Sequence, residues 1–138
     1  MKRTILILLA VIMSVVSVSV CAADDKDSEG AVIEFAEKKY DFGTVSADAK
    51  PVVHEFEFTN TGTSPLLIVS ASASCGCTRP KYTTEPVKPG KTGKIKVTFL
   101  PAGQKGYVSK DIKVRTNDRR HRRVTLKITG NVIPADKK

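Results

Sequence analysis

The chain has 138 residues, three cysteines, no tryptophan and a formal net charge of +9. This length allows little more than one domain, and a domain of that size can bury a hydrophobic core without needing disulfides to fold. The charge is uneven: residues 24–59 sum to −6 (four Lys, ten acids), and 60–138 sum to +13 (seventeen Lys and Arg, four acids). Such polarity bears on partners and solubility rather than on the fold.

The N-terminus has the pattern of a secretory signal peptide. Two basic residues precede an uncharged and mainly apolar run over 5–20, and small residues follow at 22 and 23. A run of about 16 residues is shorter than the roughly 20 that a transmembrane helix needs, so we predict cleavage rather than a retained anchor. We expect a signal peptide over 1–23, a flexible leader over 24–30, and export to the periplasm or the cell exterior. Lipid anchoring through Cys21 is less favoured, because lipoprotein signals usually place Gly, Ala or Ser before the cysteine and this chain has Val20.

Apolar and polar residues then alternate with a period of two. The stretches VVHEFEFTN (52–60), GKIKVTF (93–99), DIKVRTN (111–117) and RVTLKITGNV (123–132) each place β-branched or aromatic residues on one face and charged or hydroxyl residues on the other. Such alternation is typical of half-buried strands. After the signal peptide, no window of the sequence keeps a helical period.

Turn-forming residues separate these stretches. Gly, Pro, Asn and Asp gather at 60–65, 85–93, 101–106 and 117–122. Strands at this spacing predict an all-β protein, a β-sandwich of about seven antiparallel strands over residues 31–134 followed by a short polar tail over 135–138. A small closed barrel is the alternative architecture.

Five motifs together resemble a family of exported bacterial proteins known as domain of unknown function 1573. They are YDFGTV (40–45), FTNTGTSPLLI (58–68), ASCGCTRP (73–80), PVKPGKTGKIKVTFLPAGQKGYVSKDIKVRTN (86–117) and VTLKITGNV (124–132). The resemblance spans about residues 33 to 133. It implies an immunoglobulin-like sandwich, similar in style to major sperm protein and hydin-type domains. It implies no activity, because none is assigned to the family.

Cys75 and Cys77 follow a stretch whose alternation continues the inward face, formed by Leu67, Val69, Ala71 and Ala73. As thiols, the two cysteines would be small buried hydrophobes. A disulfide instead requires the chain to turn at Gly76, because residues i and i+2 of a straight strand lie roughly 6.6 Å apart and the Cβ atoms of a disulfide about 3.5–4.5 Å. Export favours the oxidised pair. We expect a structural thiol pair or a local disulfide, and both states stay open.

The alternative is a thiol-redox or Cu(I)-handling protein that uses Cys75 and Cys77, since Cu(I) accepts few soft ligands. Zinc would need four ligands, and the two histidines read as a core-edge residue (His54) and a solvated one (His121). The chain has no Cys-x-x-Cys, no Gly-x-Ser-x-Gly, no phosphate loop and no zincin motif. We therefore expect a protein that is not an enzyme, with no catalytic residue, metal or cofactor.

The basic part of the chain offers a candidate binding patch. The stretch VRTNDRRHRRVTL predicts a hairpin of strands 111–116 and 123–132. Alternation and the loop would gather seven cations, namely Lys113, Arg115, Arg119, Arg120, Arg122, Arg123 and Lys127. One interpretation is a solvated sheet edge kept from pairing by its charge. The other is a patch for an anionic partner, because arginine binds phosphate and carboxylate oxygens in pairs.

We interpret the chain as a non-catalytic, exported binding or assembly module of the bacterial cell envelope. The expected partner is an envelope protein or an anionic envelope surface. We expect no binding to nucleic acid and no transmembrane segment after cleavage of the signal peptide.

Overall fold

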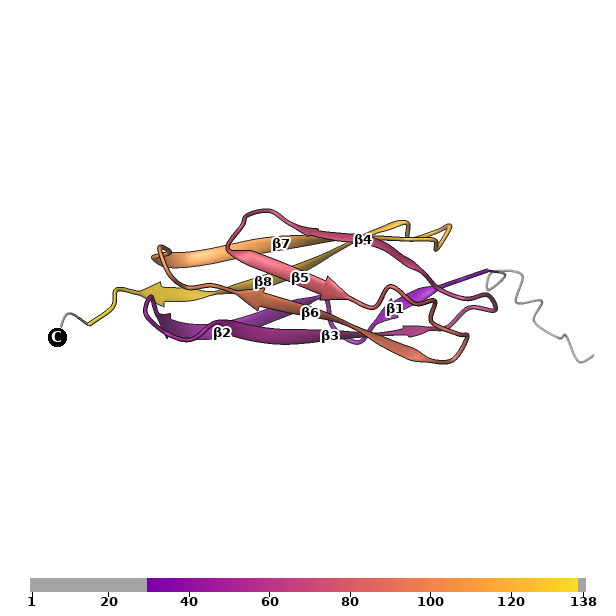
Figure 1. Ribbon diagram of the computed structural model, residues 1–138, viewed down its shortest axis with the longest axis horizontal. Coiled ribbons are helices and arrows are strands. Elements are labelled where there is room, and N and C mark those ends of the chain that lie inside the picture. The colour runs from indigo at the N-terminus through magenta and orange to yellow at the C-terminus, as the bar shows by residue number, and fades with distance from the viewer. Residues whose placement is uncertain (1–29, 137–138) are drawn as a thin grey trace, which may run out of the picture.

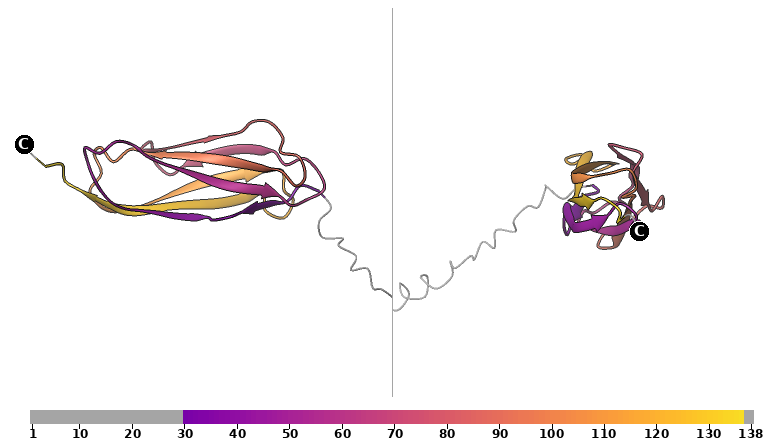
Figure 2. Two further views of the ribbon diagram at one scale, coloured as in Figure 1. Left: turned by 90° about the horizontal axis from the view of Figure 1, so that it is seen from below. Right: turned by 90° about the vertical axis from the view of Figure 1, so that its left-hand side faces the viewer.

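The computed structural model describes residues 30–136, which form two packed four-stranded sheets (Figure 1). The first sheet has the order β1 (Ile33–Phe35), β3 (Val52–Asn60), β6 (Thr92–Phe99) and β5 (Thr78–Tyr82). The second has the order β2 (Lys39–Ser46), β8 (Arg123–Ile133), β7 (Gly106–Thr116) and β4 (Ile68–Ala73). The strands run along the long axis of an elongated body (Figure 2). The predicted signal peptide lies outside the described residues.

The predicted all-β sandwich is confirmed, with eight strands rather than about seven. The additional strand arises because the first extended segment divides between the sheets. Its first part, β1, pairs antiparallel with β3, and its second part, β2, pairs parallel with β8. The expected antiparallel pairing therefore has one exception. Within residues 30–136 no helix is long and apolar enough to cross a membrane.

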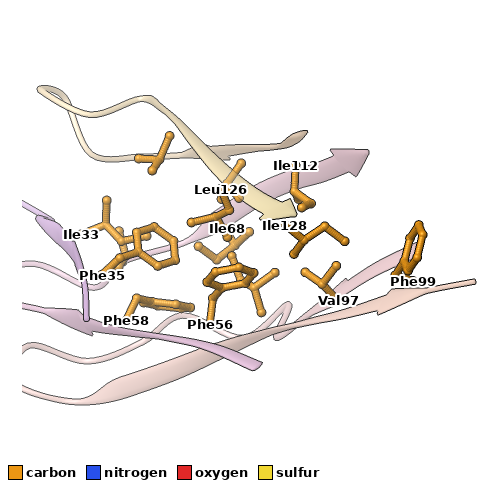
Figure 3. Packing of buried hydrophobic residues seen from close by; sticks show 14 of the residues in the cluster. Ile33, Phe35, Phe56, Phe58, Ile68, Val97, Phe99, Ile112, Leu126 and Ile128 are labelled. Carbon is orange, nitrogen blue, oxygen red and sulfur yellow. The ribbon is translucent and has the colours of Figure 1, made fainter. Parts of the chain in front are cut away.

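The alternating stretches form the hydrophobic core, as the sequence predicts. Phe56 and Phe58 of β3 are fully buried, and the apolar residues of β6 lie beside them. These side chains face those of the second sheet (Figure 3), among which Ile112, Val114, Leu126 and Ile128 are at most 2% exposed. Burying a large aliphatic or aromatic side chain stabilises a fold by about 1.5–3 kcal/mol. Period-two patterning therefore accounts for both inner faces.

The inward face predicted for the segment before the cysteines is wrong at its start. Ile68 is buried and Val69 is 50% exposed, the reverse of the expectation. The pairing of β4 with β7 shifts by one residue between Ile68 and Ser70. An extra residue in one strand moves the following side chains to the opposite face. Ala71 and Ala73 consequently do pack against the core, as expected.

Candidate functional site

The seven cations predicted as a patch lie on the outer side of β7 and β8 and in the loop that joins them. Hereafter this surface is called the basic face, and it consists of Lys113, Arg115, Arg119, Arg120, Arg122, Arg123 and Lys127. The two strands pair antiparallel, with Arg115 directly opposite Arg123. Like charges in facing positions repel each other. The sandwich therefore holds two arginines together at a cost that an anion placed between them would relieve.

Five of these cations line two adjoining surface depressions. The first, of about 300 Å³, is lined by Lys113, Arg115 and Arg123 together with Ser72 of β4 and Thr125 of β8. Its floor contains Val114 and Val124, whose side chains belong to the core. The second, of about 390 Å³, is lined by Val69, Arg115, Thr116, Asn117, Arg119, Arg122 and Arg123. Arg115 and Arg123 belong to both depressions, and no acidic residue is among the described residues that line them.

The other two cations of the basic face are placed differently. Lys127 lies opposite Asp111, and its Nζ is 3.1 Å from Asp111 Oδ1. This ion pair offsets the charge of Lys127. Arg120 does not line either depression, and its backbone N–H donates to Asp118 Oδ1 at 2.8 Å. Five of the seven predicted residues therefore line the two adjoining depressions, which together are called the basic hollow: Lys113, Arg115, Arg119, Arg122 and Arg123.

The loop between β7 and β8 is fixed by a buried carboxylate that sequence reasoning missed. Asp118 is 1% exposed. Its Oδ1 accepts hydrogen bonds from the backbone N–H groups of Arg120 (2.8 Å) and His121 (3.1 Å). Its Oδ2 accepts one from the N–H of Ile33 at 3.0 Å, which ties the loop to β1 in the other sheet. The backbone that carries Arg119 and Arg122 is thus held by the fold.

The same contacts set the ionisation of Asp118. Burial by itself raises the pKa of a carboxyl group, since it disfavours the charged form. Here the backbone N–H groups of Ile33, His121 and Arg120 outweigh burial and lower the pKa of Asp118 below its ordinary value. His121 Nδ1, 3.3 Å from Asp118 Oδ2, acts in the same direction. The group that anchors the loop is therefore a carboxylate at neutral pH.

A second set of contacts anchors the loop to the segment before β4. Asn117 Oδ1 accepts from the N–H of Leu67 at 2.8 Å, and Asn117 Nδ2 donates to the carbonyl of Pro65 at 3.0 Å. The N–H of Asn117 donates to the carbonyl of Leu67 at 3.1 Å. Asn117 also lines the second depression, so these hydrogen bonds fix part of the lining of that depression.

The cysteine pair lies away from the basic hollow, in the turn that joins β4 to β5. The chain bends at Gly76, and a disulfide joins Cys75 to Cys77, whose Cα atoms lie 5.3 Å apart. Both cysteines are half-buried, and Cys77 packs against the core. Because β4 and β5 are edge strands of different sheets, this turn closes one side of the sandwich. Its function as a structural element stays a prediction.

The histidines do not join either cluster. His54 lies at the edge of the core, where its ring stacks on Tyr40 (centroids 3.7 Å apart) and its Nε2 is 2.6 Å from Glu37 Oε1. The side chain of His121 is 59% exposed, and its Nδ1 lies 3.3 Å from Asp118 Oδ2. Within residues 30–136, no group of three or more His, Cys, Asp or Glu side chains is placed to hold a metal ion.

Sequence reasoning also missed Asn60, a fully buried polar residue at the end of β3. Its Nδ2 donates to the carbonyls of Ser64 (2.8 Å) and Val87 (2.9 Å), and its Oδ1 accepts from the N–H of Gly62 (3.0 Å). Both Asn60 and Asp118 lie in segments rich in turn-forming residues. The available signal is that Asn and Asp side chains in turns commonly bond nearby backbone groups.

Known structures share this fold at low sequence identity. A protein of unknown function from Porphyromonas gingivalis W83 matches with a TM-score of 0.65 and 18% identity, over 75% of this chain and 48% of that one. The ASH/PapD-like domain 7 of human CEP192 matches with a TM-score of 0.57 and 17% identity, over 75% of this chain and 87% of that one. The CupB2 chaperone of Pseudomonas aeruginosa matches with a TM-score of 0.53 and 12% identity, over 72% of this chain and 55% of that one.

These similarities establish a PapD-like, immunoglobulin-like sandwich. The chain spans about half the length of the Porphyromonas gingivalis structure. No curated protein matches the sequence. Residues 33–132 match the family described as "Protein of unknown function (DUF1573)", the family that the sequence motifs suggested. This match covers most of the chain, which therefore belongs to the DUF1573 family.

Proposed function

We propose that the protein is a non-catalytic, exported binding module of the cell envelope, and that it binds an anionic partner through its basic face. The observation that carries this proposal is the clustering of five cations around two adjoining depressions with no acidic residue among the described lining residues. Charges that served only to keep the protein soluble would not need to line the same depressions. The fold supports the proposal in a general way, because a chaperone and a PapD-like domain share it at low identity.

The test is binding to anionic vesicles and to a cell-envelope extract at low and physiological salt. The patch variant changes Arg115, Arg119, Arg122 and Arg123 to Ser, since these arginines line the second depression. Each cation near an anionic surface contributes about 1 kcal/mol, so we expect the variant to bind at least about a hundredfold more weakly at low salt. We also expect wild-type binding to weaken with salt, because screening shortens the range of exposed charges.

The matched control changes Lys88, Lys91, Lys96 and Lys105 to Ser. These four lysines are exposed and lie outside both depressions, and their loss changes the net charge by the same amount. We expect this control to keep most of the wild-type affinity. Equal weakening of the two variants would show that overall charge, and not the basic face, causes binding. Failure of the wild type to bind either material at low salt would reject the proposal.

A further inference from the structure

The choice of arginine in the basic face points to a more specific ligand. The chain contains sixteen lysines and seven arginines, and five of those arginines lie between residues 115 and 123. Elsewhere the chain uses lysine almost throughout for its positive charge. Lysine is a compact point charge, whereas the planar guanidinium of arginine donates two parallel hydrogen bonds to adjacent oxygens. A role in solubility alone does not explain why this segment uses arginine where the rest of the chain uses lysine.

The geometry of the hollow favours a compact anion with several oxygens. Arg115 and Arg123 face each other across β7 and β8 and belong to both depressions. Ser72 and Thr125, which carry hydroxyl groups, line the first depression beside them. A phosphate group accepts bidentate hydrogen bonds from arginine and further ones from hydroxyls. Volumes of about 300 and 390 Å³ suit a ligand the size of a lipid headgroup.

The loop that supplies the remaining arginines is organised before any ligand arrives. Asp118 and Asn117 hold its backbone through hydrogen bonds to β1 and to the segment before β4. A ligand therefore meets arginines whose backbone is already ordered, and less conformational entropy is lost on binding. This arrangement differs from a run of solvated charges on a loose turn.

One apolar side chain borders the cations. Val69 is 50% exposed because of the bulge in β4, and it lines the second depression together with Arg115 and Arg123. An exposed apolar group beside a phosphate-binding cluster matches the boundary between headgroups and acyl chains, where basic and apolar side chains act together. A soluble phosphate would gain nothing from Val69. A contact with Val69 therefore distinguishes the phosphate of a lipid headgroup from a free phosphate.

We propose that the basic hollow binds the phosphate-bearing headgroup of a membrane lipid, with Arg115 and Arg123 contacting the phosphate and Val69 contacting the lipid below it. This inference rests on the proposed function and specifies its ligand. It requires that binding depend on the shape of the anion as well as on its charge. It also requires a membrane surface for full affinity.

The test compares two kinds of neutral phosphatidylcholine vesicle, one carrying phosphatidic acid and one a long-chain fatty acid, matched in surface charge by electrophoretic mobility. We expect the wild type to bind the phosphatidic acid vesicles about tenfold more tightly, since charge-assisted hydrogen bonds to phosphate are among the stronger ones. The variant Arg115→Lys with Arg123→Lys keeps the charge and removes both guanidinium forks. It should lose the preference and still bind the fatty acid vesicles. Both positions are exposed, so the core is untouched.

Two further binding measurements distinguish a lipid phosphate from a free phosphate. One uses the variant Val69→Ser, and the other uses soluble pyrophosphate as the ligand. We expect Val69→Ser to weaken binding to phosphatidic acid vesicles and to leave pyrophosphate binding unchanged. Equal wild-type affinity for the two vesicle types would overturn the phosphate inference while leaving the anionic binding module in place. Absence of binding to both would overturn the two together. Pyrophosphate affinity as high as that for phosphatidic acid vesicles would reject the lipid as the source.

Discussion

Replacing Asp118 by Ala tests whether a buried carboxylate organises the basic face. The change removes the acceptor for the backbone N–H groups of Ile33, Arg120 and His121. The N–H of Ile33 is buried, and leaving a buried donor without its acceptor costs about 1–3 kcal/mol. The other two lie in an exposed loop and recover water, at a cost of about 0.5–1 kcal/mol each.

We therefore expect Asp118→Ala to lower the free energy of unfolding by about 2–5 kcal/mol. Urea denaturation followed by circular dichroism measures this quantity, with Glu85→Ala as a control that removes one acid at an exposed position. The same variant should weaken vesicle binding under conditions where it is folded, because Arg119 and Arg122 lose their fixed backbone. A loss no greater than that of Glu85→Ala, about 0.5 kcal/mol or less for an exposed position, would refute the anchoring function.

The ionisation of Asp118 adds a pH dependence with a definite sign. Its pKa is lower in the native state than the ordinary carboxyl value of about 3.9. The unfolded chain therefore binds this proton at a higher pH than the native state does, and the charged group favours folding. The contribution is complete above about pH 4 and is lost as the pH falls through the lower, native pKa. Asp118→Asn should reduce the acid-induced loss of stability; an unchanged slope below pH 4 would contradict the assignment.

Three further stability predictions concern the cysteine turn and the end of β3. Changing both Cys75 and Cys77 to Ala should leave a cooperative fold and cost about 1–3 kcal/mol in denaturant unfolding, since the sheets supply the core; loss of cooperativity would show that the pair is essential. Asn60→Ala should cost about 2–4 kcal/mol, because buried backbone groups lose their partners; a cost near zero in the same assay would mean that water replaces the amide. Gly62→Ala should lower the melting temperature, because an added Cβ would lie 2.1 Å from the carbonyl oxygen of Gly30; an unchanged melting temperature would show that this backbone moves apart freely.

The sequence predicted the strands well where one face is buried and the other is exposed to solvent. In β6, Ile95, Val97 and Phe99 point inward and alternate with Lys94, Lys96 and Thr98, and the pattern alone gives both the strand and its orientation. The same reasoning failed at β4, because a bulge at Val69 inserts one residue and changes the phase. An isolated glycine in a strand pattern is a usual sign of a bulge, and β4 contains no glycine. The expected inward face was therefore wrong by one residue at its start.

The candidate site was predicted in part for a similar reason. Alternation places Arg115 and Arg123 on one outer face, and a hairpin brings them together. Alternation does not show that Lys127 is paired with Asp111, because that depends on the register of the hairpin. Nor does it show that Asp118 turns inward, since an acid in a turn is ordinarily solvated. Contacts between β1 and a loop eighty-five residues later are set by the tertiary fold.

The division of the first extended segment between the two sheets has a mechanical consequence. The described chain enters at one end of the elongated body and leaves at the other, after β8 (Figure 1). Because β2 runs parallel to β8, a tension applied between these ends pulls the two strands past each other along their length. The backbone hydrogen bonds between them then share the load and must break together rather than one after another. Tension along the long axis therefore loads the pairing of β2 with β8 in shear, and not one hydrogen bond at a time.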